Sequence, residues 1–376
     1  MKITIAKDVL ADAVTWTART LPNRPPVPVL AGIRINAEPT GVVELSTFDY
    51  EVSARSEVEA EVHEAGTVLV SGRLLAEISR SLPDRPVTLQ LDGTKVVISA
   101  GPAKFTLLTM PVEEYPSLPA MPNVLGTIDG EEFATAVNQV SVAASRDETL
   151  PLLTGIRVEI ENDKITLLAT DRYRLALREL PWAPGTPGVS EVALIRARTM
   201  LDVGKSLTAS GSVSLALSTG SGVELVGFEA GGRHTTSQLL DGDYPQVRRL
   251  FPDESPIHAV VNRNELVDAV KRVALVVERN TPIRLSFTEG QVVLDAGQGD
   301  DAHASEVIEA KLDGDEIAVA FNPQYLLDGL SALTTPYVSL AFTNPNKPVE
   351  FAGQQELDGA SNQNYRYLLV PVRTLG

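Results

Sequence analysis

The sequence predicts an α+β protein built from three repeated units, each of which packs two helices on antiparallel sheets. Two observations lead to this fold class: an alternating pattern of apolar and polar residues recurs three times, and a short helical segment follows each copy at a matching place. Arg34, Arg157 and Arg284 mark the copies and lie 123 and 127 residues apart. The length of 376 residues also suits about three domains, because single domains usually hold roughly 100 to 150 residues.

The clearest copy of the pattern runs from residue 151 to residue 180. Apolar and polar residues alternate over 156–161, the pair Asn162-Asp163 interrupts them, and the alternation resumes over 165–169. Alternation places one apolar row on the buried face of a strand, and an Asn-Asp pair tolerates a tight reversal. This stretch therefore predicts a β-hairpin. The segment 169–175 that follows sets two arginines and an aspartate beside a tyrosine, which indicates a role beyond the fold.

Each unit is expected to contain two helices. The opening helices are expected at 8–20, 131–145 and 264–277. The second helices begin near Ser71, Arg196 and Asn322 and lead into alternating strands at 87–91, 213–217 and 338–342. Asn322 followed by Pro323 favours a helix start, because Asn caps free amides and Pro suits the first helical position. Turn-rich stretches at 115–122 and 250–256 predict three domains, with bounds 1–122, 123–252 and 253–376.

The composition excludes several classes of protein. No run of residues reaches the length of a membrane span and the amino terminus lacks the apolar centre of a signal peptide, so we expect a cytoplasmic protein. The absence of cysteine excludes disulfides, thiolate metal sites and a cysteine nucleophile. The net charge of −17 argues at first against nucleic-acid binding, which normally selects a basic face.

No group of residues in the sequence predicts an active site. Residues 203–206 end like a phosphate-binding loop, but Thr199 stands where that motif needs another glycine. The acidic clusters at 300–301 and 313–316 lack the spacing of a calcium loop and are expected to form hairpin turns. The four histidines show no paired spacing for a metal, and Gly231–His234 is expected to be a turn between strands. We therefore expect no catalytic residue, no metal and no cofactor.

Three segments point to one family when they occur in order on a threefold repeat. They are 169–175 (ATDRYRL), 243–252 (DYPQVRRLFP) and 367–373 (YLLVPVR). Together they resemble the bacterial DNA polymerase III beta subunit, the sliding clamp, over essentially the whole chain. The resemblance implies three domains of the DNA-clamp type and a head-to-tail homodimer, which closes into a ring around duplex DNA with helices lining the hole. It also implies a processivity factor that has no catalytic site of its own and tethers the replicative polymerase.

The distribution of charge fits such a ring. The helices that the resemblance places at the hole are 7–20, 72–81, 130–146, 195–207, 262–280 and 322–332. They carry a summed charge of +2 over 84 residues, which leaves −19 for the other 292. A mildly positive lining holds duplex DNA through its phosphates, which carry no sequence information. Arg24 matches a DNA-contacting arginine of the family most directly. The expected DNA contacts are Arg24, Arg73, Arg196, Arg198, Lys205, Lys271 and Arg272.

The resemblance also implies one peptide-binding pocket between the second and third domains. Aliphatic walls with arginines at the rim suit a short linear peptide that has apolar anchors and a polar or acidic end. The partners expected to use such motifs are the DNA polymerase III catalytic subunit, the clamp loader, other polymerases and repair proteins. The matching positions are Leu153, Thr170, Arg174, Leu175, Pro245, Arg249, Leu250, Leu368, Leu369, Val370, Pro371, Val372 and Arg373.

Three departures from the family's pattern occur at this pocket. Arg172-Tyr173 replaces a common Gly-His pair, Asn280 stands where an aromatic residue is common, and Val370 and Val372 replace methionines. The peptide preference of the pocket therefore does not follow from the family.

The resemblance assigns the dimer interface to residues at the two ends of the chain. Phe105 and Leu107 lie on the last strands of the first domain, and Ala274 and Leu275 lie on the opening helix of the third. Two other classes of protein stay open on the residues alone. One is a repeat scaffold that binds proteins without DNA, and the other is an enzyme that acts on acidic substrates.

Overall fold

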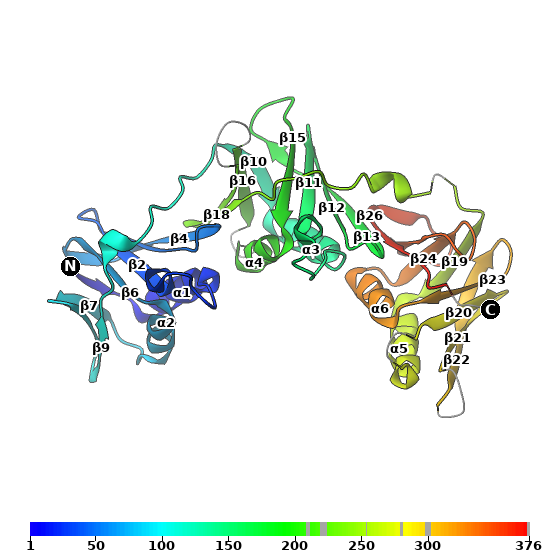
Figure 1. Cartoon of the computed structure of the whole chain (residues 1–376), viewed down its shortest axis with the longest axis horizontal. Helices are drawn as coiled ribbons and strands as arrows, with labels where there is room; N and C mark the ends of the chain where they lie inside the picture. Colours follow the sequence, from blue (N-terminus) through cyan, green and yellow to red (C-terminus); the bar gives the residue numbers. More distant parts are fainter. Residues whose placement is uncertain (208–210, 219–223, 253, 279–280, 298–301, 374–376) are drawn as a thin grey trace. The chain divides into compact units, whose positions relative to one another are not determined.

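The computed structural model describes residues 1–207, 211–218, 224–252, 254–278, 281–297 and 302–373. The chain folds into two compact units, whose elements are labelled in Figure 1. Unit 1 comprises Met1–Glu131, Trp182–Pro187 and Arg198–Leu239, and unit 2 comprises Glu132–Pro181, Gly188–Ala197 and Leu240–Gly376. Each unit holds one terminal repeat together with part of the central one.

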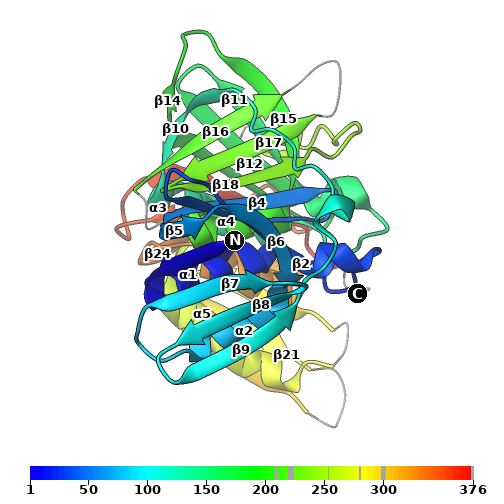
Figure 2. The same cartoon turned by 90° about the vertical axis from the view of Figure 1, so that its left-hand side faces the viewer.

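Unit 1 contains two antiparallel sheets (Figure 2). The smaller sheet has the strand order β5-β1-β7-β8-β9, and the larger has β14-β10-β16-β17-β18-β4-β3-β2-β6. The strands of the smaller sheet are β1 (Lys2–Ile5), β5 (Glu61–Glu64), β7 (Val87–Asp92), β8 (Lys95–Ala100) and β9 (Ala103–Leu108). Those of the larger sheet are β2 (Gly32–Ala37), β3 (Val42–Phe48), β4 (Val52–Glu59), β6 (Gly66–Ser71), β10 (Val124–Asp129), β14 (Ala183–Pro184), β16 (Ser212–Ser218), β17 (Leu225–Ala230) and β18 (Arg233–Gln238).

The helices of unit 1 bury one apolar face each. In α1 (Lys7–Thr17), Leu10, Ala13 and Val14 follow the spacing of a single helical face and are buried. This face joins one core with the first sheet and with α2 (Gly72–Ser81), against which α1 packs. A fully buried leucine such as Leu10 contributes about 1.5–3 kcal/mol relative to exposure. The helix α4 (Ala197–Leu207) also belongs to this unit, except for its first residue.

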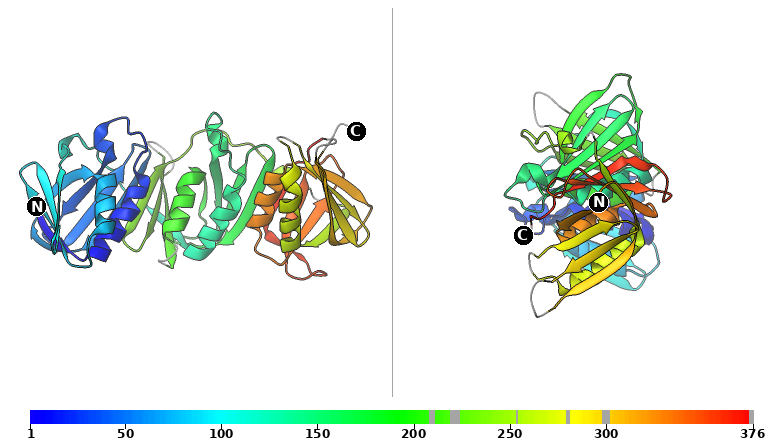
Figure 3. Two further views of the ribbon diagram at one scale, coloured as in Figure 1. Left: turned by 90° about the horizontal axis from the view of Figure 1, so that it is seen from below. Right: turned by 90° about the vertical axis from the view of Figure 1, so that its right-hand side faces the viewer.

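Unit 2 contains one continuous antiparallel sheet, in which strands of the second and third repeats join (Figure 3). Its order is β15-β11-β12-β13-β26-β25-β24-β19-β22-β21-β20-β23. The second repeat supplies β11 (Gly155–Glu161), β12 (Lys164–Thr170), β13 (Arg174–Pro181) and β15 (Ser190–Arg196). The third supplies β19 (Ile257–Asn262), β20 (Ile283–Thr288), β21 (Gln291–Ala296), β22 (Ala304–Asp313), β23 (Ile317–Phe321), β24 (Tyr337–Phe342), β25 (Val349–Gln354) and β26 (Ser361–Leu369).

The helices of unit 2 begin with the caps that their sequences favour. Asn322 accepts hydrogen bonds from the backbone amides of Gln324 (2.9 Å) and Tyr325 (3.2 Å) at the start of α6 (Pro323–Ala332), which confirms the predicted cap. Gly329 of α6 meets the ring of Tyr367 on β26, where an added Cβ would lie only 2.3 Å from a ring carbon. The other helices are α5 (Arg263–Val273) and α3 (Gly130–Ser141), whose first two residues belong to unit 1.

The predicted fold class is confirmed by this architecture. The described residues form six α-helices, two in each repeat, and every strand pairing between them is antiparallel. The hairpin at residues 155–170 forms as expected, and Asn162 in its turn takes the left-handed backbone with φ 53°. The turn predicted at Gly231-Gly232 connects the paired strands β17 and β18. The hairpin turn predicted at 313–316 is wrong, because this stretch leads from β22 to β23, and β23 pairs with β20 instead. Residues 300–301 lie outside the described residues. The three domain bounds remain a prediction.

Two predicted helix bounds are wrong. Arg196 is the last residue of β15 rather than part of a helix, because it continues the pairing of that strand with β11 at Gly155. The helix α3 ends at Ser141 instead of residue 145. Beyond that point the amides of Ala143 and Ala144 bond three residues back, and the amide of Ser145 donates to the carbonyl of Leu153 at 2.8 Å. Those tighter bonds lead the chain off the helix axis.

Candidate functional site

An apolar cluster in unit 2 contains side chains of β12, β13, β15 and β26. Its buried members come from the second repeat, the loop after it and the last strand of the chain, and three of them were predicted pocket residues: Leu153, Leu175 and Leu368. Leu175 and Leu368 are paired residues of β13 and β26, so they lie side by side on the same face. The other buried members are Leu168, Leu177, Leu194, Tyr244 and Phe251.

Tyr244 fixes the loop that runs over this cluster. Its hydroxyl oxygen accepts a hydrogen bond of 3.0 Å from the backbone amide of Thr170, at the end of β12. Burial raises the pKa of Tyr244, so the phenol stays protonated at neutral pH. Further along the loop, the ring of Phe251 lies 4.2 Å from the guanidinium carbon of Arg366, which bonds Glu350 through two nitrogens. The loop is thereby anchored at both ends of the cluster.

Asp171 organises the turn between β12 and β13. Its Oδ1 accepts hydrogen bonds from the amides of Tyr173 (3.0 Å) and Arg174 (3.1 Å), and the hydroxyl of Thr170 accepts one from the amide of Arg172 (3.1 Å). These bonds hold Arg172 in the left-handed region at φ 81°. That conformation costs a residue with a side chain about 1–2 kcal/mol, so it persists only where its surroundings impose it.

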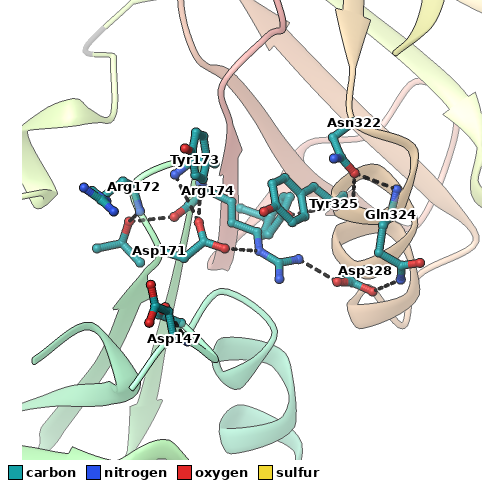
Figure 4. Close-up of polar contacts among 12 residues, drawn as sticks. Asp147, Asp171, Arg172, Tyr173, Arg174, Asn322, Gln324, Tyr325 and Asp328 are labelled. Carbon is teal, nitrogen blue, oxygen red and sulfur yellow. Dashed lines mark hydrogen bonds and ion pairs between the residues drawn. The ribbon is translucent and has the colours of Figure 1, made fainter. Parts of the chain in front are cut away.

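Arg174 lies on the opposite face of the sheet from Leu175, because neighbouring residues of a strand alternate. Figure 4 shows its guanidinium between Asp171 and Asp328. Its Nε donates to Asp171 at 2.9 Å and its Nη1 donates to Asp328 of α6 at 2.6 Å. The ring of Tyr325 lies 4.3 Å from its guanidinium carbon. Burial alone would lower the pKa of Arg174, but Tyr367, Asp328 and Asp171 together raise it. The guanidinium is thus buried, charged and compensated by two carboxylates.

Tyr173 continues this group of side chains to the surface. Its ring stacks on Tyr325 with centroids 6.1 Å apart and planes inclined by 29°, yet 57% of Tyr173 is exposed. Its carbonyl accepts a hydrogen bond of 2.9 Å from the amide of Val370. Two residues on, the amide of Val372 donates to the carbonyl of Ala320 at 2.7 Å. The chain after β26 is therefore held beside the Asp171 turn and β23.

The remaining predicted pocket residues divide between the surface and the core. Leu250 is 51% exposed, and Val370 and Val372 also offer apolar surface. Leu369 is fully buried but outside the apolar cluster, since it pairs with Arg174 and follows Leu368 along the strand. Pro371 is buried, whereas the side chains of Pro245, Arg249 and Arg373 are exposed. Asn280 lies outside the described residues.

The residues predicted to contact DNA occupy different environments in unit 1. Arg73 of α2 donates to the side chain of Asn23 at 3.2 Å, which brings the exposed Arg24 close to that helix. Arg198 and Lys205 are exposed on α4. Both lie near Asp202, where burial raises the pKa of the carboxyl while Arg198, Lys205 and Arg19 oppose that rise.

The residues of unit 2 that are predicted to contact DNA lie near acidic side chains or are partly buried. Arg272 of α5 is paired with Glu306 of β22, and its Nε lies 3.0 Å from the Oε2 of that carboxylate. Lys271 is exposed and lies 4.0 Å from Asp268. Arg196 is partly buried at the end of β15.

The predicted interface residues are mostly on the surface. Phe105 is exposed on β9, and Leu275 is 84% exposed in the 3-10 turn Ala274–Val276 after α5. Ala274 is partly buried. Leu107, in contrast, belongs to the core of unit 1, and its neighbour Leu108 is the exposed residue.

Sequence reasoning missed the residues that arrange this site. Asp171 belongs to the segment 169–175 that carries the resemblance, and Tyr325 and Asp328 belong to the expected helix 322–332, but the sequence pattern assigns none of them a function. Their spacing of three residues, which puts an aromatic ring and a carboxylate on one helix face, was the available signal. Tyr244 belongs to the segment 243–252, whose pattern likewise assigns it no function.

Three family models match consecutive stretches of the chain. They describe the N-terminal domain of the DNA polymerase III beta subunit over residues 1–119, its central domain over 127–246 and its C-terminal domain over 248–373. The chain belongs to the DNA polymerase III beta subunit family. A beta sliding clamp of Streptomyces coelicolor is 55% identical over 377 residues, which cover both chains completely. A beta sliding clamp of Micrococcus luteus is 57% identical over 313 residues, 83% of this chain and 100% of that one.

Solved structures of the beta subunit family have the same fold. The sliding clamp of Bacillus subtilis superposes with a TM-score of 0.91 at 27% identity, covering 100% of this chain and 99% of that one. A sliding clamp of Pseudomonas aeruginosa bound to griselimycin gives a TM-score of 0.91 at 25% identity and full coverage of both chains. The resemblance inferred from the three sequence segments is thereby confirmed, including the three repeated clamp domains.

Within the described ranges, no three His, Asp or Glu side chains gather closely enough to hold a metal ion. None of the helices that the structure describes is both long and apolar enough to cross a membrane.

The first repeat of the beta subunit contains the same turn in unit 1. Asp49 accepts hydrogen bonds from the amides of Glu51 (3.0 Å) and Val52 (2.7 Å), and Tyr50 between them has φ 76°. The amide of Phe48 donates to the hydroxyl of Tyr115 at 2.8 Å, as Thr170 does to Tyr244. Burial raises the pKa of Tyr115 to about 12. The two sites therefore provide a matched pair for experiment.

We expect Tyr244→Phe to loosen the Asp171 turn, because the buried amide of Thr170 then has no partner and such a loss costs about 1–3 kcal/mol. Hydrogen exchange measured by mass spectrometry should become faster in a peptide that spans 168–175. Tyr115→Phe is the matched control and should accelerate exchange around Phe48 while it leaves 168–175 unchanged. Equal exchange at 168–175 in wild type and Tyr244→Phe would contradict the role given to this bond.

Proposed function

We propose that this protein is a DNA sliding clamp: two copies form a ring that encircles duplex DNA and tethers the replicative polymerase. The observation that carries this proposal is the match of all three beta subunit domains in order, together with 55% identity to a beta sliding clamp over the whole chain. The protein then acts as a processivity factor without chemistry of its own. Its place is the cytoplasm, where bacterial DNA is replicated.

Retention by topology explains how an acidic protein can work on DNA. A closed ring stays on duplex without tight contacts, so the net charge of −17 is compatible with DNA as a partner. Phosphate contacts from Arg24 and Arg73 in unit 1 are not specific for sequence and let the ring move along the duplex. The acidic remainder of the chain discourages DNA from binding elsewhere.

Two free strand edges support a head-to-tail dimer. β9 is the edge strand of its sheet in unit 1, and it exposes Phe105 and Leu108, the latter at 69%. In unit 2, residues 304–309 of β22 pair only with β21 among the described strands. Val307 in this stretch is 56% exposed. A free edge presents unpaired backbone groups that another strand can complete.

The two edges also match in charge. β9 contains Lys104, whereas the free stretch of β22 contains the exposed Glu309 beside Glu306, which is already paired with Arg272. Because the surfaces differ and lie at different ends of the chain, each copy offers one of each to its partner. Such a heterologous contact closes into a ring when the rotation between copies permits it.

The apolar cluster and the Asp171 turn support the peptide-binding role. Leu250, Val370 and Val372 expose apolar side chains, and Leu175 and Leu368 lie buried in the cluster. A short peptide with apolar anchors suits this surface. The partners that we propose are the polymerase III catalytic subunit, the clamp loader, other polymerases and repair proteins.

Topological retention tests the proposed function directly. The clamp, once placed on a circular plasmid by a clamp loader, should remain bound through gel filtration and should run off after the plasmid is linearised. A repeat scaffold that binds only proteins would show no retention on the circle. Equal retention on circular and linear plasmids would indicate ordinary DNA binding and would count against a ring.

Leu275→Asp or Val307→Asp should each give monomers of 40.3 kDa, because a carboxylate buried at an interface without a partner costs several kcal/mol. Sedimentation velocity at low micromolar concentration is the measurement. Val192→Asp is the control, since Val192 is an exposed apolar residue of unit 2 on β15, eight strands from β22 in the sheet order. A full-mass dimer in both interface variants would sink the proposed interface.

Replacing Arg24 and Arg73 with Glu should weaken duplex binding about equally for all sequences. Each lost phosphate contact lowers the slope of log affinity against log salt by about 0.9. The fold should survive, because both side chains are exposed. Binding to a duplex fragment is titrated at several salt concentrations, and Lys95→Glu on β8 is the control. An unchanged slope in the double variant would place the DNA on another surface.

A further inference from the structure

We propose that Arg172 reads a carboxylate on the partner peptide and so determines peptide specificity, whereas Arg174 only positions the turn. The proposal rests on the peptide-binding role given above. The exposed Arg172, which replaces a small residue common in the family, then sets the charge preference of the site. Arg174, the buried arginine that matches the family's motif, does not.

Arg174 has no free capacity for a peptide carboxylate. Its guanidinium donates to Asp171 at 2.9 Å and to Asp328 at 2.6 Å, and only 6% of its side chain is exposed. Gln324 donates to the other oxygen of Asp328 at 2.7 Å, so that carboxylate is also fixed. Two acids already balance this single positive charge. An incoming carboxylate would have to displace one of them.

Arg172 has the opposite surroundings. Its side chain is exposed and points away from the Arg174 group (Figure 4). Within the part of the chain that the structure describes, it forms no ion pair. Hydrogen bonds from Thr149 are the first cause that lowers the pKa of Asp147, and the charge of Arg172 is the last. Asp147 is thus already occupied by Thr149, at 2.6 Å and 2.9 Å, and leaves the guanidinium of Arg172 available.

The turn itself does not require an arginine at this position. The same turn in unit 1 places Tyr50 at φ 76°, where its ring packs edge-on against Phe48. Both turns are held by the backbone bonds to an aspartate, so the side chain at the left-handed position is free to vary. Arg172 also precedes Tyr173, which is largely exposed and whose carbonyl bonds the chain after β26. A peptide seated on that chain passes within reach of an exposed cation that forms no ion pair among the described residues.

The expected preference is small and sensitive to salt. A solvent-exposed ion pair favours a peptide with Asp over the same peptide with Asn by about two- to fivefold at low ionic strength. Screening should remove most of this preference near 1 M salt, where the Debye length falls to about 3 Å. The apolar anchors do not contribute to the ratio because they are identical in both peptides.

Calorimetric titration of peptide pairs tests the assignment. The probe is a clamp-binding peptide of the replicative polymerase, made as a series in which one Asp, or the matched Asn, is moved through the positions outside its apolar anchors. Wild type should show an Asp:Asn affinity ratio of about two to five at one of these positions. R172Q, which keeps the backbone and the length of the side chain, should bring the ratio to one. R172E should invert it.

Two further variants distinguish recognition of the peptide carboxylate from positioning of the turn. R174A should weaken Asp and Asn peptides by the same factor, because it disturbs the turn that both peptides use. R249Q removes another exposed arginine among the predicted pocket residues and should leave the ratio unchanged. A ratio that survives R172Q, or that is lost in R249Q or R174A instead, would overturn the proposal.

The same titrations distinguish a failure of the role given to Arg172 from a failure of the proposed peptide site. L175S should abolish or strongly weaken binding of every peptide if the apolar cluster is the pocket. No binding of the native peptide to wild type, or full binding to L175S, would refute the proposed peptide site. Normal binding to wild type with no Asp:Asn difference at any position would refute only the role of Arg172.

Discussion

The backbone pairing between β13 and β26 is the constraint on which the candidate site depends. Five residue pairs, from Arg174 with Leu369 to Arg178 with Tyr365, fix the register of the last strand against the second repeat. Because side chains alternate along a strand, a shift by one residue would exchange the two faces of the shifted strand relative to its partner. The apolar cluster around Leu175 and the charged group around Arg174 are therefore consequences of a single register.

The first repeat shares the backbone arrangement of the candidate site but differs from it in side chains. In unit 1, β4 pairs with β18, and the amide of Gln238 donates to the carbonyl of Glu51 as that of Val370 does to Tyr173. Where unit 2 pairs Leu175 with Leu368, however, unit 1 pairs Ser53 with Thr236, and their hydroxyls lie 2.6 Å apart. The same fold thus presents an apolar surface in one place and a polar one in the other.

The sequence predicted those features that depend on neighbouring residues. Alternation and the Asn162 turn predicted the hairpin, and Asn322 predicted the start of α6, because strand periodicity and caps act over a few residues. Motif resemblance supplied most of the site. It did not show that Arg174 and Leu175 face opposite sides of the sheet, or that Arg174 meets Asp328, a partner 154 residues away. Contacts of that kind depend on how strands from two repeats pair. A local pattern of residues does not determine this pairing.

The compensation of Arg174 decides what a buried arginine can do in this fold. Its charge is stable in the interior only because Asp171 and Asp328 both bond it, and removal of either acid would leave an unbalanced charge away from water. A ligand that competed for Arg174 would impose the same penalty on the acid it displaced. The buried group is therefore suited to holding the turn in one geometry. Discrimination by charge falls to side chains that meet the ligand in solvent, where desolvation costs least and where a substitution such as Arg172 can change specificity without disturbing the fold.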